Sequence, residues 1–182
     1  SENGIRYQLR DAGYNNIGSP VFGTGGTISL PTGALSSTTT FNILATNTVT
    51  GCNYPLTNTA IVTVNQLPVV TAPSNVCVGS TGTLSPTTGG TWVSSNNSLA
   101  TVTNAGVVTG VAAGSVTFTF TQTSTGCPAT TASVTVSPLP NNVAASAASA
   151  TVCSGSSTSI VITGSQSGVD YQLRNNSGNV LI

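Results

Sequence analysis

The side chains that could carry acid–base, metal or phosphate chemistry lie at the two ends of this 182-residue sequence. The chain has three arginines and three acidic residues, with no Lys and no His. These six charged residues are Glu2, Arg6, Arg10, Asp11, Asp170 and Arg174. Positions 12–169 carry no charge at all, whereas about a quarter of the residues in a typical soluble domain are charged.

This distribution argues against a catalytic function. General acid–base catalysis needs a titratable group near the reacting bond, and Ser or Thr nucleophiles need a base to activate them. The ligand clusters that bind zinc or calcium are missing, as is a basic patch for nucleic acid or anionic lipid. The apolar runs are too short for a membrane-spanning helix. We therefore predict no enzyme, no cofactor, no metal, no nucleic-acid binding and no membrane insertion.

Four cysteines remain as chemically active residues: Cys52, Cys77, Cys127 and Cys153. Zinc sites use closely spaced pairs such as Cys-x-x-Cys, and these cysteines are about 25 or 50 residues apart. Disulfides fit this spacing better, and they indicate an oxidising, extracellular environment.

Internal repeats indicate how the chain is organised. Residues 46–68 and 121–140 share a Thr-x-Thr-x-Thr-Gly-Cys segment, a Val-Thr-Val strand and a closing Leu-Pro, and VCVGST at 76–81 resembles VCSGSS at 152–157. These pairs give a module of roughly 75 residues. A longer period relates residues 4–10 to residues 168–174, each containing Tyr-Gln-Leu-Arg, at an offset of 164. We predict the end of one module at 1–68, a complete module at 69–140 and the start of a third, of the same type as the first, at 141–182.

The pattern of residues within the complete module is typical of an all-β fold. Short alternating segments rich in Val and Thr are separated by turn residues, which favours a β-sandwich. Residues 115–123 alternate strictly and place Val116, Phe118 and Phe120 on one face. We expect Phe118, Phe120 and the single tryptophan, Trp92, to form the core.

Residues 91–120, TWVSSNNSLATVTNAGVVTGVAAGSVTFTF, resemble the bacterial Ig-like group 2 domain. The matching features are Trp92, the Ser-Ser-Asn segment at 94–96, Ala-Thr-Val at 100–102, the Gly-Val-Val-Thr-Gly hairpin at 106–110 and Gly114. The resemblance implies tandem Ig-like sandwiches in an elongated array, as in the stalks of surface adhesins. The Val-Cys-x-Gly-Ser and Thr-Gly-Cys segments look like those of giant Bacteroidetes surface proteins, among them the gliding-motility adhesins of the SprB type.

The phase of the repeats favours one pairing of the cysteines. It predicts a disulfide between Cys77 and Cys127 within the complete module. It also predicts that Cys52 and Cys153 each pair with a cysteine of a neighbouring repeat outside this sequence. A Cys52–Cys153 bridge stays open as an alternative. In the chain-entropy model, closing the loop between Cys77 and Cys127 would stabilise the module by roughly 4 kcal/mol.

The repeated Tyr-Gln-Leu-Arg segment has two interpretations. It is either a strand with its tyrosine in the core and its arginine at the rim, or a contact between successive modules made by Tyr7, Arg10, Tyr171 and Arg174.

We predict an extracellular, cell-surface stalk segment that presents a distant adhesive tip and serves attachment or gliding. Its expected partners are neighbouring repeats, other copies in a filament and, through the tip, an external surface or polysaccharide. The alternative is a carbohydrate-binding repeat, for which Tyr14 and Tyr54 are the best candidates for exposed aromatic rings.

Overall fold

The computed structural model describes residues 1–178 and residue 180. Its regular elements are all strands, and the all-β prediction is confirmed. The chain divides into two compact units, one of residues 1–69, 89–91 and 120–129, and one of residues 70–88, 92–119 and 130–182. The predicted module boundaries at residues 68 and 140 remain predictions. Among the described residues, no helix is present that could cross a membrane.

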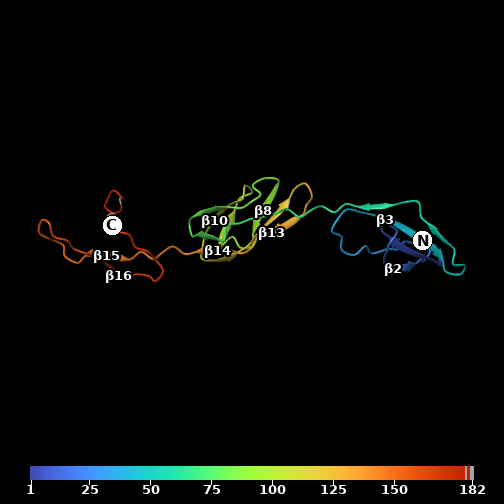
Figure 1. The fold of residues 1–182 in the computed structure, drawn as a ribbon, viewed down its shortest axis with the longest axis horizontal. Coiled ribbons are helices and arrows are strands. Elements are labelled where there is room, and N and C mark those ends of the chain that lie inside the picture. Colours follow the sequence, from blue (N-terminus) through green and yellow to red (C-terminus); the bar gives the residue numbers. More distant parts are fainter. Residues whose placement is uncertain (179, 181–182) are drawn as a thin grey trace. The chain divides into compact units, whose positions relative to one another are not determined.

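Residues 1–62 form one five-stranded sheet (Figure 1). Strand β1 (Ile5–Arg10) pairs antiparallel with β2 (Asn16–Phe22) on one side and with β3 (Thr39–Asn47) on the other. The long strand β3 also pairs with β4 (Asn53–Pro55) and β5 (Ala60–Val62). The Tyr-Gln-Leu-Arg segment is therefore a central strand, hydrogen-bonded on both edges.

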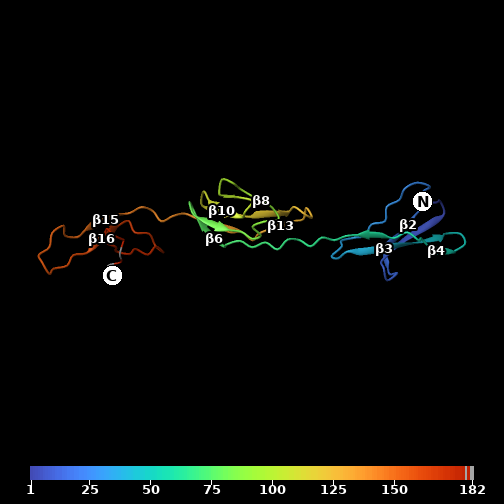
Figure 2. The same ribbon diagram turned by 90° about the horizontal axis from the view of Figure 1, so that it is seen from above.

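The middle of the chain contains three small sheets. The first has the order β7 (Thr81–Thr83), β10 (Val107–Gly110), β9 (Ala100–Val102). The second has the order β11 (Gly114–Val116), β14 (Val134–Ser137), β6 (Asn75–Cys77). Strand β6 of this sheet is labelled in Figure 2. The third has the order β13 (Pro128–Thr130), β12 (Phe118–Gln122), β8 (Gly90–Ser94).

The residues expected to form a single strand at 115–123 form two. Thr117 separates β11 from β12, and the two strands belong to different sheets. The backbone N–H of Thr117 donates to Ser95 Oγ over 3.0 Å, and its carbonyl accepts from the N–H of Ser95 over 2.9 Å. The alternation nevertheless continues through the break, because Val116, Phe118 and Phe120 are all buried.

Residues 141–178 contain one hairpin-like pair of strands. Strand β15 (Ala144–Ala147) pairs antiparallel with β16 (Ile160–Thr163), with Ala145 opposite Ile162 and Ala147 opposite Ile160. The alanine-rich segment at 144–147 is thus extended where it pairs. Residues 169–173, the second Tyr-Gln-Leu-Arg copy, have no strand assigned, and Arg174 makes a single bridge to Val180.

Candidate functional site

The terminal strands of the middle module lie side by side and run parallel. Asn75, Val76 and Cys77 of β6 pair with Thr135, Val136 and Ser137 of β14. Backbone hydrogen bonds extend this pairing at both ends, from Thr135 N to Ser74 O over 3.0 Å and from Val78 N to Ser137 O over 2.9 Å. Because the chain enters along β6 and leaves along β14 in the same direction, opposite pulls on the two ends load these bonds in shear.

The strands of this pair are anchored by a buried apolar core. Val76, Val134 and Val136 are 5, 0 and 1% exposed. Of the residues expected in the core, Phe118 is fully buried, Phe120 is 1% exposed and Trp92 is 4% exposed. The indole Nε1 of Trp92 donates to Pro86 O over 2.8 Å, so burial of the ring leaves its N–H satisfied.

The Ser-Ser-Asn segment fixes the connection after β8. Ser94 Oγ donates to Ala100 O over 2.7 Å and is itself buried. The Ser95 hydroxyl accepts from Thr117, and Asn96 Oδ1 accepts from the N–H of Ser98 over 2.9 Å. Each polar side chain satisfies a backbone group of a turn or strand break, so these residues act on backbone geometry.

In residues 1–62, Tyr7 and Arg10 make their interactions within their own sheet. The backbone N–H of Glu2 donates to Tyr7 Oη over 2.9 Å. Arg10 Nε donates to Asn42 Oδ1 over 2.9 Å, and its guanidinium carbon lies 5.1 Å from the centre of the Tyr14 ring. The Arg10 Nη2 atom is buried without a hydrogen-bond partner.

The second copy of this segment repeats the tyrosine contact. The N–H of Gln166 donates to Tyr171 Oη over 2.9 Å, which is the Glu2–Tyr7 bond moved by 164 residues. Arg174 differs from Arg10, since it donates to Gly178 O and Gln172 Oε1 over 3.3 and 3.2 Å. Arg10 has its partner in the same sheet and Arg174 has its partners within residues 172–178, and the contact between modules stays a prediction.

The structure does not bring the four cysteines together. All four are free thiols; Cys52, Cys77 and Cys153 are exposed and Cys127 is half-buried. Cys77 ends β6, opposite Ser137, whereas the carbonyl of Cys127 accepts from Gln122 N after β12, and β6 and β12 belong to different sheets. The Cys77–Cys127 disulfide expected from the repeat phase is not formed in this structure. No cluster of metal-binding side chains occurs among the described residues.

One titratable group is clearly shifted. Hydrogen bonds from the Asn15 side chain and backbone, with a further bond from the Gly13 N–H, lower the pKa of Asp11 below its ordinary value of 3.8. These bonds close the β1–β2 turn. Tyr14, in this turn, has a φ of 65° and is 67% exposed. Tyr54 in β4 is 62% exposed, so both tyrosines singled out as candidate platforms face solvent.

Sequence reasoning missed the parallel pairing of β6 with β14. The residues Asn75-Val76-Cys77 are too few to show a period, and only Val76 among them is buried. The available signal was the Val-Cys-x-Gly-Ser segment, whose Gly79 follows the strand with a φ of 79° and marks a turn.

Comparison with known proteins identifies the middle module. No curated protein matches the chain. Residues 74–136 match the family model described as Bacterial Ig-like domain (group 2), and this range begins just before β6 and ends within β14. Such domains are generally non-catalytic. A bacterial Ig-like domain of group 2 is thus found at residues 74–136 of this chain.

Proposed function

We propose that the chain is a load-bearing structural repeat in the stalk of a long extracellular surface filament or adhesin. The observation that carries this proposal is the parallel pairing of β6 with β14. When the ends of such a module are pulled apart, the evenly spaced bonds of the parallel ladder share the load and must break together. A module joined at its ends by a single hairpin would instead open one bond at a time.

The surroundings of the Ig-like domain support the same proposal. The Glu2–Tyr7 and Gln166–Tyr171 hydrogen bonds are equivalent, so the domain lies between two copies of one structural element. That arrangement is what a tandem array requires. The proposal includes an adhesive tip elsewhere in the filament and a target surface or polysaccharide for that tip. It also includes a role in attachment or gliding, as in SprB-type adhesins.

The charge-poor surface also suits a stalk. Positions 12–169 have no Asp, Glu, Lys or Arg, so they form no ion pairs that salt could screen or that a change of pH could break. Solvent-facing positions of β7 and β9 carry threonine, such as Thr81 and Thr101, which keeps exposed strands hydrated without charge. The module is then expected to keep its strength across the range of ionic conditions found outside cells.

Labelling of intact cells tests the proposed location. An antibody raised against the purified chain is expected to label the outside of unbroken source cells, along thin filaments seen by electron microscopy. Labelling that appears only after the cells are lysed would contradict a surface stalk.

A carbohydrate-binding repeat is the second candidate, favoured by the exposure of Tyr54. This ring lines a hollow of about 300 Å³ together with polar side chains that include Glu2, Asn47 and Asn53. Binding of the chain to a glycan array, lost in Tyr54→Ala and kept in Tyr14→Ala, would favour this candidate. Absence of binding by the parent chain would remove it.

A further inference from the structure

We propose that residues 70–73, which we call the strap, open and close on the middle module without unfolding it. The strap joins the module at one isolated antiparallel bridge, between Thr71 and Ser85. The role that we assign to it rests on the load-bearing function proposed above: when the chain is pulled, the strap comes away first and the β6–β14 pair then carries the load. The opening itself is a property of the module and is measured without load.

The bridge that holds the strap is small. The N–H of Thr71 donates to Ser85 O over 3.0 Å, and the N–H of Ser85 donates to Thr71 O over 3.0 Å. Among the described residues, Val70 and Ala72, on either side of Thr71, have no hydrogen-bond partner. Segments held by few hydrogen bonds and few buried contacts open locally, at a smaller cost in free energy than global unfolding.

The strap also buries little apolar surface. Thr71 is exposed, and Ala72 and Pro73 are only half-buried. The main packing contact is that of Pro73 with Gly82, where a Cβ added to the glycine would lie 3.0 Å from Pro73 Cγ. Firm burial begins after the strap, at Val76 of β6, which is 5% exposed.

The opposite side of the bridge is fixed in the module. Leu84, the residue before Ser85, is fully buried, and its N–H donates to Gly106 O over 2.8 Å. The carbonyl of Pro86, the residue after Ser85, accepts from Trp92 Nε1 over 2.8 Å. When the bridge breaks, the strap therefore moves and Ser85 stays in place.

Release of the strap leaves the Ig-like domain complete. The first bond of the β6–β14 pairing runs from Thr135 N to Ser74 O, one residue after the strap ends. The family match covers residues 74–136, so the strap lies outside it. The range that defines the domain thus begins where the firm pairing begins.

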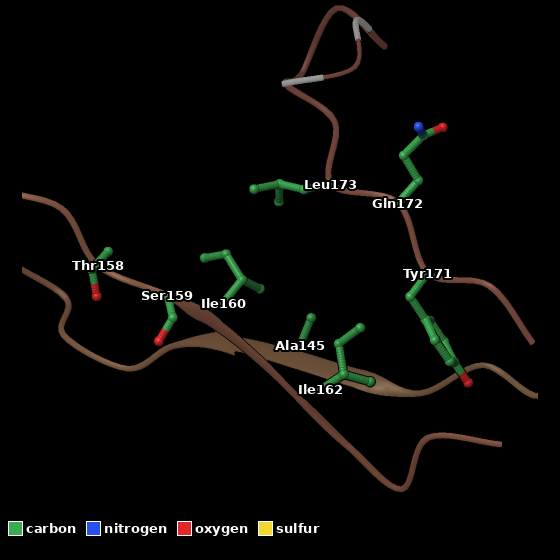
Figure 3. Close-up of a pocket in the computed structure, with 8 residues that line it drawn as sticks. All are labelled: Ala145, Thr158, Ser159, Ile160, Ile162, Tyr171, Gln172 and Leu173. Atoms are coloured by element: carbon green, nitrogen blue, oxygen red, sulfur yellow. The ribbon is translucent and has the colours of Figure 1, made fainter. Parts of the chain in front are cut away.

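The next repeat contains a fully paired version of the strap. Ala147 lies six residues before the cysteine of its repeated segment, as Thr71 does in the middle module. There the segment is strand β15, which pairs with β16 over four residues. In Figure 3 the side chains of Ala145 and Ile162, which are opposite each other in this pair, lie next to each other. The same segment is therefore a strand in one module and a single bridge in the other.

A proline explains this difference between the modules. In the next repeat, the N–H of Ser149 donates to Thr158 Oγ1 over 3.1 Å, just beyond the β15–β16 pair. The equivalent positions of the middle module, at the offset of 76 between the two repeated cysteines, are Pro73 and Gly82. Proline has no N–H to donate, and glycine has no hydroxyl to accept. The strap thus occupies the place of a strand but lacks the bonds that would hold it there.

Amide hydrogen exchange of the full chain, followed by NMR, tests the proposal. One opening of the strap exposes the N–H groups of Thr71 and Ser85 together, so their protection factors are expected to be equal. We expect both to be on the order of 100-fold below that of the Thr135 N–H, which exchanges only when the domain unfolds. Both should still exceed the values of an unstructured chain, because the strap is mostly closed.

A proline in the strap separates its opening from unfolding of the domain. Thr71→Pro removes one of the two donors of the bridge. It is expected to abolish protection of the Ser85 N–H and to leave protection of the Thr135 N–H unchanged to within about twofold. Val69→Pro is the matched control, because Val69 is 84% exposed and has no hydrogen-bond partner among the described residues. It should leave both amides as they are in the parent chain.

Single-molecule stretching tests the role under load. Thr71→Pro is expected to rupture at the force of the parent chain, because the β6–β14 bonds remain. A chain that bears no load would give low forces for parent and variant alike, and the exchange results would still hold.

Four results would each overturn the strap. They are equal protection of the Thr71 and Thr135 N–H groups, an unprotected Thr71 N–H in the parent chain, loss of Thr135 protection in Thr71→Pro, and a rupture force that Thr71→Pro lowers.

Discussion

Asn175 occupies in its turn the position that Asp11 occupies 164 residues earlier. Asp11 Oδ1 accepts from the N–H of Gly13 over 2.8 Å, and Asn175 Oδ1 accepts from the N–H of Ser177 over 3.0 Å. The carbonyls of the same two residues accept from Tyr14 N and Gly178 N, and these residues have φ values of 65° and 79°. The two copies thus build one turn, with a carboxylate in one and an amide in the other.

The carboxylate of Asp11, which the second copy replaces by the amide of Asn175, predicts how stability depends on pH. The folded pKa of Asp11 is lowered, so its ionised form contributes stability above the unfolded pKa, and that contribution is lost as pH falls through the folded pKa. Asp11→Asn is expected to keep the turn, as Asn175 does, and to remove the fall below about pH 4 that this group causes. A titration of the Asp11 carboxyl by NMR with a midpoint above 3.8 would contradict the assignment.

Between about pH 4 and pH 7 we expect the stability of the chain to be nearly constant, because there is no His and few groups titrate in that range. Thermal unfolding followed by circular dichroism at closely spaced pH values measures this directly. A steep change of Tm inside the range would show that the few charged residues control folding.

The core prediction compares two valines of the middle module. Val134→Ala removes two methyl groups from a fully buried position, and we expect it to lower the free energy of unfolding by about 2 kcal/mol. Val93→Ala is the control, since Val93 is 62% exposed, and its effect should stay within about 0.5 kcal/mol. Trp92, the single tryptophan, reports the unfolding of this module by fluorescence. Equal effects of the two substitutions would contradict the observed core.

From the free cysteines we predict that a reducing agent does not change the stability of the chain. Since all four thiols are free, a reducing agent should leave the Tm of the chain unchanged, and Cys77→Ser should change the free energy of unfolding by less than about 1 kcal/mol. A bridge between Cys77 and Cys127 would make reduction cost roughly 4 kcal/mol. Peptide mass spectrometry of the unreduced chain identifies any bridge that forms.

The mechanical account predicts that one substitution weakens the module under load. Thr135→Pro removes the N–H that donates to Ser74 O, and it is expected to lower the unfolding force markedly. Thr101→Pro is the control in β9, an edge strand outside the β6–β14 pair, and proline is tolerated best on edge strands. Loss of force in both variants to the same degree would show that the β6–β14 bonds do not determine the strength.

The sequence was sufficient for the fold class and the main core, for identifiable physical reasons. Val116, Phe118 and Phe120 alternate with threonines, and a period of two has one structural meaning. The break at Thr117 could not be predicted, because the pattern runs through it unchanged and Ser95, which bonds Thr117 at the break, is distant in sequence.

The candidate site was less accessible to sequence reasoning. The repeats indicated that Cys77 and Cys127 occupy fixed module positions, but a repeat phase carries no information about which strands share a sheet. The pairing of β6 with β14 joins residues at the two ends of the module, and a parallel neighbour leaves no local signature. The tyrosine of this contact lies in the repeated Tyr-Gln-Leu-Arg segment, which the sequence shows. The donor, the backbone N–H of Glu2 or Gln166, has no sequence signal.

Single-molecule stretching of the chain between its two ends tests the load-bearing role most directly. We predict a discrete rupture for the middle module at high force, because forced unfolding reports the barrier for breaking the β6–β14 bonds together. The rupture should release on the order of 20 nm of chain, given up to ~3.6 Å per extended residue over positions 74–136. Gradual extension at low force, with no discrete rupture of that length, would contradict a structural stalk.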